Sequence, residues 1–164
     1  MLPTPVLHRF YAAVPPSIPS ARTELADFAA RSGVGEDQLH RIRLSVSEAL
    51  TNVVEHAYEN EDGQIELFGT ITDGELWVFV ADEGRGLRQG HHSEGLGLGL
   101  VSMALFSDGL TIANRSWRGL EVRMRFSLDS ASGSRGLTSE DHWRRLRQRP
   151  HPAFLPRRSP ASAR

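Results

Sequence analysis

The chain contains neither cysteine nor lysine. The absence of cysteine excludes disulfide bonds and thiolate metal sites, and it fits a reducing compartment. The absence of lysine excludes a catalytic lysine and the lysine of a phosphate-binding P-loop, because all 19 basic residues are arginine. The formal net charge is −1, so the molecule as a whole is not a binder of polyanions.

Long apolar runs are also lacking. None approaches the roughly 20 residues of a membrane span, and the first residues, MLPTPVLHRF, do not read as a charged segment followed by an apolar signal core. We therefore expect a cytoplasmic protein that does not use a membrane. The 164 residues, 39% of them hydrophobic, suit one domain with a tail. We expect the domain at residues 1–128 and a flexible tail rich in Arg, Pro and Ser at 129–164.

The expected tail is strongly basic. From Ser130 onward it holds eight arginines and two acidic residues, a formal charge of +6 that leaves −7 on the rest of the chain. Such a split suits a nucleic acid, an acidic partner or the acidic body of the protein itself. A solvated tail explains it as well, and we favour that interpretation, so direct nucleic-acid binding is not expected.

Hydrophobic periodicity predicts a strand, two helices, two strands, a glycine-rich loop, a helix and two strands. The expected bounds are 6–14, 20–32, 36–58, 64–72, 75–82, 95–108, 109–116 and 119–128. Ser20 is the expected cap of the first helix, and Asp73 with Gly74 predicts a hairpin turn. This order indicates an α+β fold, a two-layer sandwich of a mixed, mostly antiparallel sheet with helices on one face.

The segment SVSEALTNVVEHAY in the second helix carries a first candidate motif. Glu48, Asn52 and His56 are spaced by four residues, so they stack along one side, roughly opposite the apolar stripe. The asparagine offers an oxygen ligand for magnesium, and the glutamate can accept a proton from a hydroxyl or water. A solvated helix face explains the same pattern, and on this helix alone it is the simpler explanation.

Two glycine-rich segments follow. In VFVADEGRGL, Asp82 ends a strand and can accept a hydrogen bond from an amine, while Gly84 and Gly86 let the backbone approach a flat ligand; a plain turn is the alternative. In GLGLGLVSM, three alternate glycines enter a helix whose free N–H groups can bind an anion. It is no P-loop and no convincing dinucleotide fingerprint, and a flexible loop is the alternative.

Taken together and in order, the three segments resemble a known family. EALTNVVEHAY, DEGRGL and GLGLGL are similar to the boxes of the anti-sigma-factor serine/threonine kinases, which belong to the histidine-kinase-like ATPases with the GHKL or Bergerat fold. The ending His56–Tyr58 is particularly like this group. The resemblance covers about Leu7 to Leu128 and leaves the tail out.

The resemblance implies ATP and Mg²⁺ as cofactors. It makes Glu48 the general base and Asn52 the magnesium ligand, with Asp82 bound to the adenine amine. His56 is carried over as a lesser contact near the phosphates. The implied ATP-binding set is Asn52, His56, Asp82, Gly84, Gly86, Gly95, Leu96, Gly97, Leu98 and Gly99.

Three other residues are less constrained. Arg85 lies inside the first glycine box and could face a phosphate or a partner. His91 and His92 depart from the family pattern; adjacent histidines can touch a metal, but exposed loop residues are the simpler explanation.

The resemblance also implies an activity and partners. The activity is transfer of the γ-phosphoryl group of ATP to a small antagonist protein of the STAS type. The partners are that antagonist, a sigma factor held away from polymerase, and a second copy in a homodimer. The alternative is a non-catalytic ATP- or ADP-binding switch that sequesters a regulatory partner. A sensor histidine kinase, a topoisomerase-like ATPase and a nucleic-acid regulator fit less well.

Overall fold

The computed structural model describes residues 5–59, 61–86 and 97–128. The helices are α1 (Ser17–Arg31), α2 (Glu36–Asn52), the π-helical turn η1 (Val53–Ala57) and α3 (Gly97–Phe106). The strands are β1 (Val6–Ala12), β2 (Gln64–Thr72), β3 (Glu75–Asp82), β4 (Gly109–Asn114) and β5 (Leu120–Ser127). The predicted tail, 129–164, and the loop histidines lie outside the described residues.

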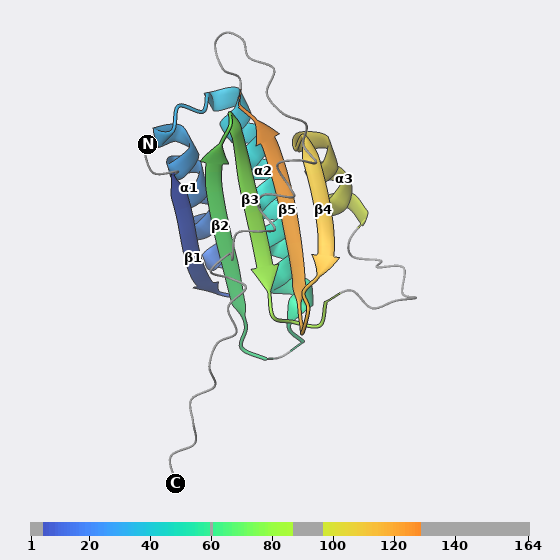
Figure 1. Cartoon of the computed structure of the whole chain (residues 1–164). Helices are drawn as coiled ribbons and strands as arrows, with labels where there is room; N and C mark the ends of the chain where they lie inside the picture. The colour runs from blue at the N-terminus through green and yellow to red at the C-terminus, as the bar shows by residue number, and fades with distance from the viewer. Residues whose placement is uncertain (1–4, 60, 87–96, 129–164) are drawn as a thin grey trace. The chain divides into compact units, whose positions relative to one another are not determined.

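The strands form one sheet of five in the order β1-β2-β3-β5-β4 (Figure 1). Every pairing among the described strands is antiparallel. The predicted hairpin between β2 and β3 is present, and Asp73 and Gly74 have φ values of 52° and 76°. Both residues are thus in the left-handed region that a tight two-residue hairpin requires.

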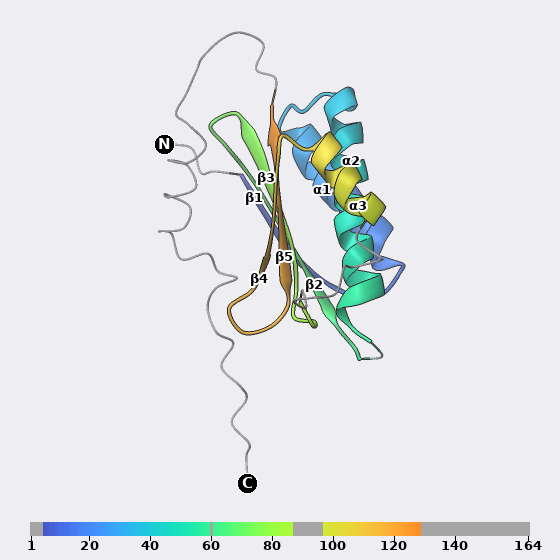
Figure 2. The same ribbon diagram turned by 90° about the vertical axis from the view of Figure 1, so that its right-hand side faces the viewer.

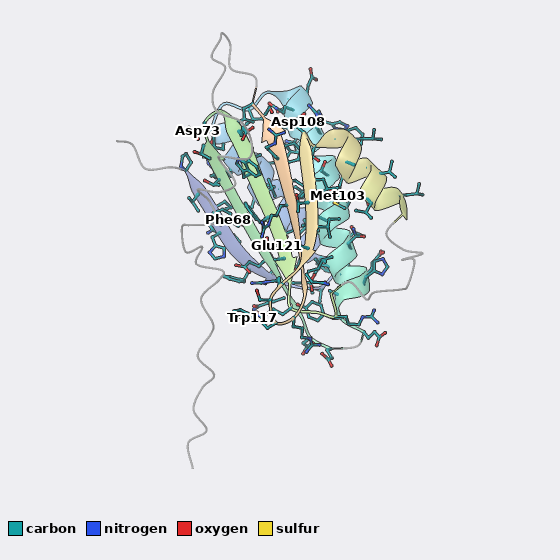
Figure 3. The ribbon with its side chains drawn as sticks, turned by 45° about the vertical axis from the view of Figure 1, so that its right-hand side comes forward. Phe68, Asp73, Met103, Asp108, Trp117 and Glu121 are labelled. Atoms are coloured by element: carbon teal, nitrogen blue, oxygen red, sulfur yellow. The ribbon has the colours of Figure 1, made fainter. Side chains whose placement is uncertain are left out.

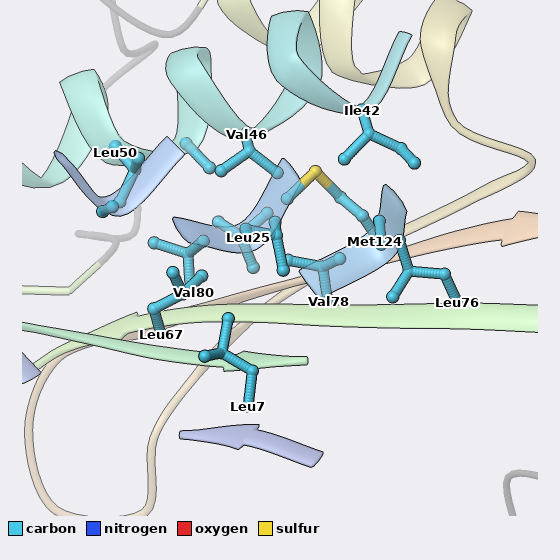
Figure 4. Packing of buried hydrophobic residues seen from close by; sticks show 14 of the residues in the cluster. Leu7, Leu25, Ile42, Val46, Leu50, Leu67, Leu76, Val78, Val80 and Met124 are labelled. Carbon is cyan, nitrogen blue, oxygen red and sulfur yellow. The ribbon is translucent and has the colours of Figure 1, made fainter. Parts of the chain in front are cut away.

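Figure 2 shows the second layer: α1, α2 and α3 all lie on the same face of the sheet. The core fills the space between the layers (Figure 4). The predicted stripe of α2 is buried along its whole length, and it packs in one cluster with strand residues such as Leu67 and Val80. Full burial of each such side chain contributes about 1.5–3 kcal/mol, so this stripe fixes α2 against the sheet. The predicted α+β class, with helices on one face, is confirmed.

Helix α1 begins at Ser17, earlier than the expected cap at Ser20. Pro19 lies in the first turn of the helix, where the missing N–H costs nothing because no intrahelical partner exists there. Ser20 does not cap the helix; its hydroxyl donates to the carbonyl of Pro16 at 3.3 Å. The predicted boundary was therefore wrong by about one turn.

The second helix also differs from its prediction. It is α-helical only to Asn52 and continues as the π-helical turn η1 before it ends at Ala57. A π-turn pairs residues five apart, so it inserts an offset into the four-residue spacing of the motif. Glu48 and Asn52 keep the α-helical relation, whereas His56 falls beyond the offset. Among the described residues, no helix combines the length and hydropathy needed to cross a membrane.

Candidate functional site

The three motif segments meet at one end of the fold. The end of β3 lies against the end of η1, where the N–H of Arg85 donates to the carbonyl of Ala57 at 3.1 Å. The start of α3 lies against α2 at Gly99. Residues that are dozens of positions apart in the sequence therefore surround one region.

Gly99 touches the polar side of α2 directly. A Cβ atom at Gly99 would lie 2.8 Å from Oε2 of Glu48 and 3.8 Å from both amide atoms of Asn52. Only a residue without a side chain lets the first turn of α3 approach these two groups so closely. The start of α3 also carries backbone N–H groups that have no partner inside the helix, and these suit an anion.

The amide nitrogen of Asn52 is unpaired within the described part of the chain. Its Nδ2 atom is buried and makes no hydrogen bond to the described residues. Buried polar groups are rarely left unpaired, and an orphaned one often marks the place of a ligand. Because the oxygen and nitrogen of an asparagine amide are assigned from their partners, either end can face such a ligand. Within the described part of the chain, the carboxylate of Glu48 also forms no hydrogen bond or ion pair.

These residues fit a magnesium ion that is held mainly by a nucleotide. The described residues contain no group of three or more His, Asp or Glu side chains that could cage a metal by themselves. Magnesium in nucleotide sites commonly uses one or two protein oxygens and completes its shell with phosphates and water. The orphaned amide of Asn52 beside the α3 N-terminus is compatible with that arrangement.

Asp82 ends β3 and is buried, with 4% of its surface exposed. Its Oδ1 atom accepts hydrogen bonds from the N–H of Gly84 at 2.8 Å and the N–H of Leu120 at 3.3 Å. Burial raises the pKa of the Asp82 carboxyl above its usual range, and these two bonds offset only part of the rise. Oδ2 accepts no hydrogen bond from the described residues, so it is the oxygen open to a ligand donor.

The two glycines after Asp82 are required by close packing. A Cβ atom at Gly84 would overlap the backbone carbonyl of Ala57 in η1. Gly86 has a φ of 66°, and a Cβ atom there would lie 2.6 Å from Oδ1 of Asn114. The first glycine box is thus pressed between η1 and the end of β4, and its role in shaping an adenine pocket stays a prediction.

Arg85 and His56 lie next to each other at the edge of the candidate site. The guanidinium of Arg85 is bound by the carboxylate of Glu59 and also donates to the carbonyl of His56 at 3.1 Å. These two contacts fix the direction of the Arg85 side chain, which the sequence left open. The ring of His56 is 46% exposed and lies 3.7 Å from the carboxylate of Glu55, so its predicted contact with ATP stays a prediction.

The glycine-rich start of α3 is described only in part. Gly97 and Leu98 belong to α3, and the side chain of Leu98 is 87% exposed. Gly95 and Leu96 lie outside the described residues, as do His91 and His92. The contacts expected of these four residues therefore stay predictions.

The sequence predicted the turn between β4 and β5, residues 115–119, only as a connection between two strands and missed its contact with Asp82. Arg115 donates to the backbone carbonyl of Asp82 at 3.4 Å, and Gly119 packs against the same carbonyl. The N–H of Leu120 reaches the carboxylate itself. No local motif marks this contact, because the place of the turn against Asp82 depends on the pairing of β3 with β5.

Comparison with known proteins agrees with this architecture. The family model described as "Histidine kinase-like ATPase domain" matches residues 11–126. A Clostridium botulinum protein named "Anti-sigma F factor" is 33% identical over 117 residues, which are 64% of this chain and 82% of the relative. A protein of the same name from Caldanaerobacter subterraneus is 34% identical over 63% of this chain and 80% of its own length. Another, from Bacillus velezensis, is 29% identical over 72% of this chain and 89% of its own length.

A solved structure shares the fold. The crystal structure of the RsbU and RsbW domains of a Mycobacterium tuberculosis protein matches with a TM-score of 0.62 and 23% identity. The match covers 77% of this chain and 32% of that longer chain. The fold and the three converging segments define the class of this protein, which is that of the histidine-kinase-like ATPases. Within that class, the chain belongs to the anti-sigma-factor family.

Proposed function

We propose that this protein is an ATP-dependent serine/threonine protein kinase that also acts as an anti-sigma factor. It phosphorylates a small STAS-type antagonist protein and sequesters a sigma factor. The observation that carries the catalytic half is the approach of Gly99 to Glu48 and Asn52. The name of the relatives, "Anti-sigma F factor", supports the half that concerns the sigma factor.

Asp82 binds the adenine ring in this proposal. Its Oδ1 atom is occupied by two backbone N–H groups, which leaves Oδ2 to accept a hydrogen bond from the exocyclic amine. Gly84 and Gly86 carry no side chain that would separate the backbone from the flat base. The base therefore lies beside the end of β3, and the phosphates extend toward the start of α3.

Asn52 would hold the magnesium ion through its amide oxygen. Magnesium held there would neutralise charge that develops on the phosphates during transfer. The free N–H groups at the start of α3 would bind the phosphates. Arg85 is engaged by Glu59 and by a carbonyl, so we assign it no phosphate.

Glu48 acts as the general base. Its carboxylate accepts the proton of a serine or threonine hydroxyl while that oxygen forms a bond to the γ-phosphorus. The bond from this phosphorus to the bridging oxygen breaks, and ADP leaves with the electron pair. The carboxylate suits this task because no described residue competes for it by a hydrogen bond or ion pair.

The test separates nucleotide binding from transfer. Calorimetric titration of ATP, with and without Mg²⁺, measures binding, and labelled ATP with a panel of purified STAS-domain proteins measures transfer. We expect Glu48→Gln to bind ATP within a few-fold of wild type and to transfer phosphate at least ~100-fold more slowly. Glu36→Gln is the matched control, since Glu36 is on the same helix and its side chain is 83% exposed.

The outcomes are distinct. Transfer at the wild-type rate by Glu48→Gln would remove Glu48 from the role of base. Nucleotide-dependent binding of a sigma factor without transfer to any antagonist would make the protein a non-catalytic switch. Absence of ATP binding at millimolar concentration would leave only a partner-binding domain with this fold.

The proposal also covers the domain organisation, the cellular location and the oligomeric state of the protein. Residues 1–128 form the ATP-binding domain, and 129–164 form an appended basic tail. The protein works in the cytoplasm as a homodimer, without a membrane and without direct contact to nucleic acid. Sedimentation equilibrium of the full chain tests the dimer, and a monomer at micromolar concentration contradicts it. The same measurement on residues 1–128 tests whether the domain folds independently, and aggregation contradicts that.

A further inference from the structure

The turn between β4 and β5, residues 115–119, contacts the described part of the first glycine box, residues 82–86. At one end, Arg118 donates to the carbonyl of Gly84 at 3.3 Å. At the other, Leu120, the first residue of β5, donates its N–H to the Asp82 carboxylate at 3.3 Å. Figure 3 places Trp117, at the tip of this turn, at the end of the sheet opposite Asp73 and Asp108.

Gly119 makes this contact close. Its φ is 96°, and a Cβ atom there would overlap the backbone carbonyl of Asp82. The N–H of Arg115 donates to the carbonyl of Gly119 at 3.0 Å, which closes the turn. The turn is therefore held in one conformation directly against the residue that is proposed to bind adenine.

Arg115 links this turn to the far face of the sheet. One guanidinium nitrogen, Nη1, donates to the carbonyl of Asp82 at 3.4 Å, and the other, Nη2, lies 3.3 Å from the carboxylate of Glu66 in β2. Both side chains of the Arg115–Glu66 pair are only 9% exposed. A buried charge pair of this kind is strongly disturbed when one partner is removed, because the other is left uncompensated.

Glu66 is anchored in turn from β1. Its second carboxylate oxygen lies 2.9 Å from Nε2 of His8. Four segments, namely β1, β2, the end of β3 and the β4–β5 turn, are thus joined by one polar network at the base end of the proposed site. Besides this positional role, the positive charge of Arg115 opposes the rise that burial imposes on the pKa of Asp82.

We propose that the β4–β5 turn orients Asp82 so that the site selects adenine over guanine, and that Arg115 is its positioning residue. This inference rests on the proposed ATP site. The N–H of Leu120 and that of Gly84 hold Oδ1, so the carboxylate cannot rotate without losing both bonds, and Oδ2 keeps one direction. Adenine presents an amine donor to that oxygen. Guanine presents a carbonyl at the same position, which is repelled by a carboxylate and leaves it unpaired.

The experiment measures the dissociation constants of ATP and GTP by calorimetry for the full chain and for point variants. For wild type we expect ATP to bind at least ~100-fold more tightly than GTP, the range that an unpaired polar group produces. We expect Arg115→Ala to reduce this ratio at least tenfold, because the turn and the Asp82 carbonyl lose their common anchor. Arg115→Lys should restore little, since one ammonium group cannot reproduce the two directed contacts of the guanidinium.

A matched control is available on the same sheet. Arg125 in β5 binds Glu75 at 2.6 Å and the carbonyl of Asp108 at 2.8 Å, at the far end from the turn. Arg125→Ala also removes an ion pair within the sheet, one that is 20–23% exposed, and should leave the ATP-to-GTP ratio unchanged. Glu66→Gln provides a milder disturbance of Arg115, and it keeps the measurement possible if Arg115→Ala does not fold.

The results separate this inference from the function on which it rests. Wild-type protein that binds neither nucleotide would remove the proposed ATP site. Wild-type protein that prefers ATP, with the same preference in Arg115→Ala and Glu66→Gln, would overturn the positioning role alone. An equal fall of the ratio in Arg125→Ala would also overturn it, because the effect would then come from general loss of stability.

Discussion

Substitution of Gly99 by alanine should separate stability from catalysis in this protein. Gly99 lies in the first turn of α3, where alanine stabilises a helix by about 0.5–1 kcal/mol relative to glycine. The new methyl group would lie 2.8 Å from Oε2 of Glu48, closer than ordinary contact. That atom is the end of a flexible side chain, so it can withdraw by roughly half an ångström at little cost to the fold.

The same withdrawal should be costly for transfer. Misplacement of a catalytic group by about 1 Å can reduce a rate ~100-fold, so half that displacement predicts a loss of about tenfold. A tenfold loss corresponds to about 1.4 kcal/mol of transition-state stabilisation. We therefore expect Gly99→Ala to unfold at a higher urea concentration than wild type and to transfer phosphate about tenfold more slowly.

The assay pairs urea denaturation with single-turnover phosphate transfer. Ala104→Gly is the control, because Ala104 is an exposed residue of the same helix and its substitution reverses the propensity change without touching Glu48. It should lower stability and leave transfer unchanged. If Gly99→Ala transfers phosphate at the wild-type rate while it is more stable, the position of Glu48 against α3 has no part in catalysis.

Three further substitutions probe the site. Asp82→Asn should weaken ATP binding at least tenfold, because an amide can face the adenine amine with a donor. Since burial raises the pKa of Asp82, wild type should lose stability as the pH rises from the ordinary carboxyl range through that raised value. The variant should not lose stability in this way, and urea midpoints at several pH values test the difference. Asn52→Ala should keep or raise the melting temperature, because the buried Nδ2 of Asn52 has no partner among the described residues. The same variant should abolish the gain in ATP affinity on adding Mg²⁺. A gain that calorimetry still detects contradicts the role of Asn52 as a ligand. Gly84→Ala should destabilise the fold by about 1–3 kcal/mol, because its methyl group meets the backbone of Ala57 and not a side chain that can move, and an unchanged denaturation midpoint refutes the close packing.

Much of the fold was readable from local pattern. The buried stripe of α2 and the hairpin at Asp73–Gly74 depend on short-range periodicity and turn chemistry, so they were predicted residue by residue. The start of α1 was not, because Ser20 fits a cap by residue type alone, whereas the helix begins at Ser17 and has no side-chain cap. The π-helical offset at Val53 was also missed, because no local preference announces where a helix widens.

The candidate site divides in the same way. The sequence by itself determined which residue types are present, where the glycines interrupt the chain, and that Glu48 and Asn52 share a helix face, because helical geometry is local. Only the tertiary structure decided that Gly99 approaches that face, that Arg85 turns to Glu59, and that the turn of Arg115 holds Asp82. These contacts join residues 26 to 51 positions apart in the chain, where no periodicity reaches, and packing of α3 on α2 and pairing of β3 with β5 bring them together.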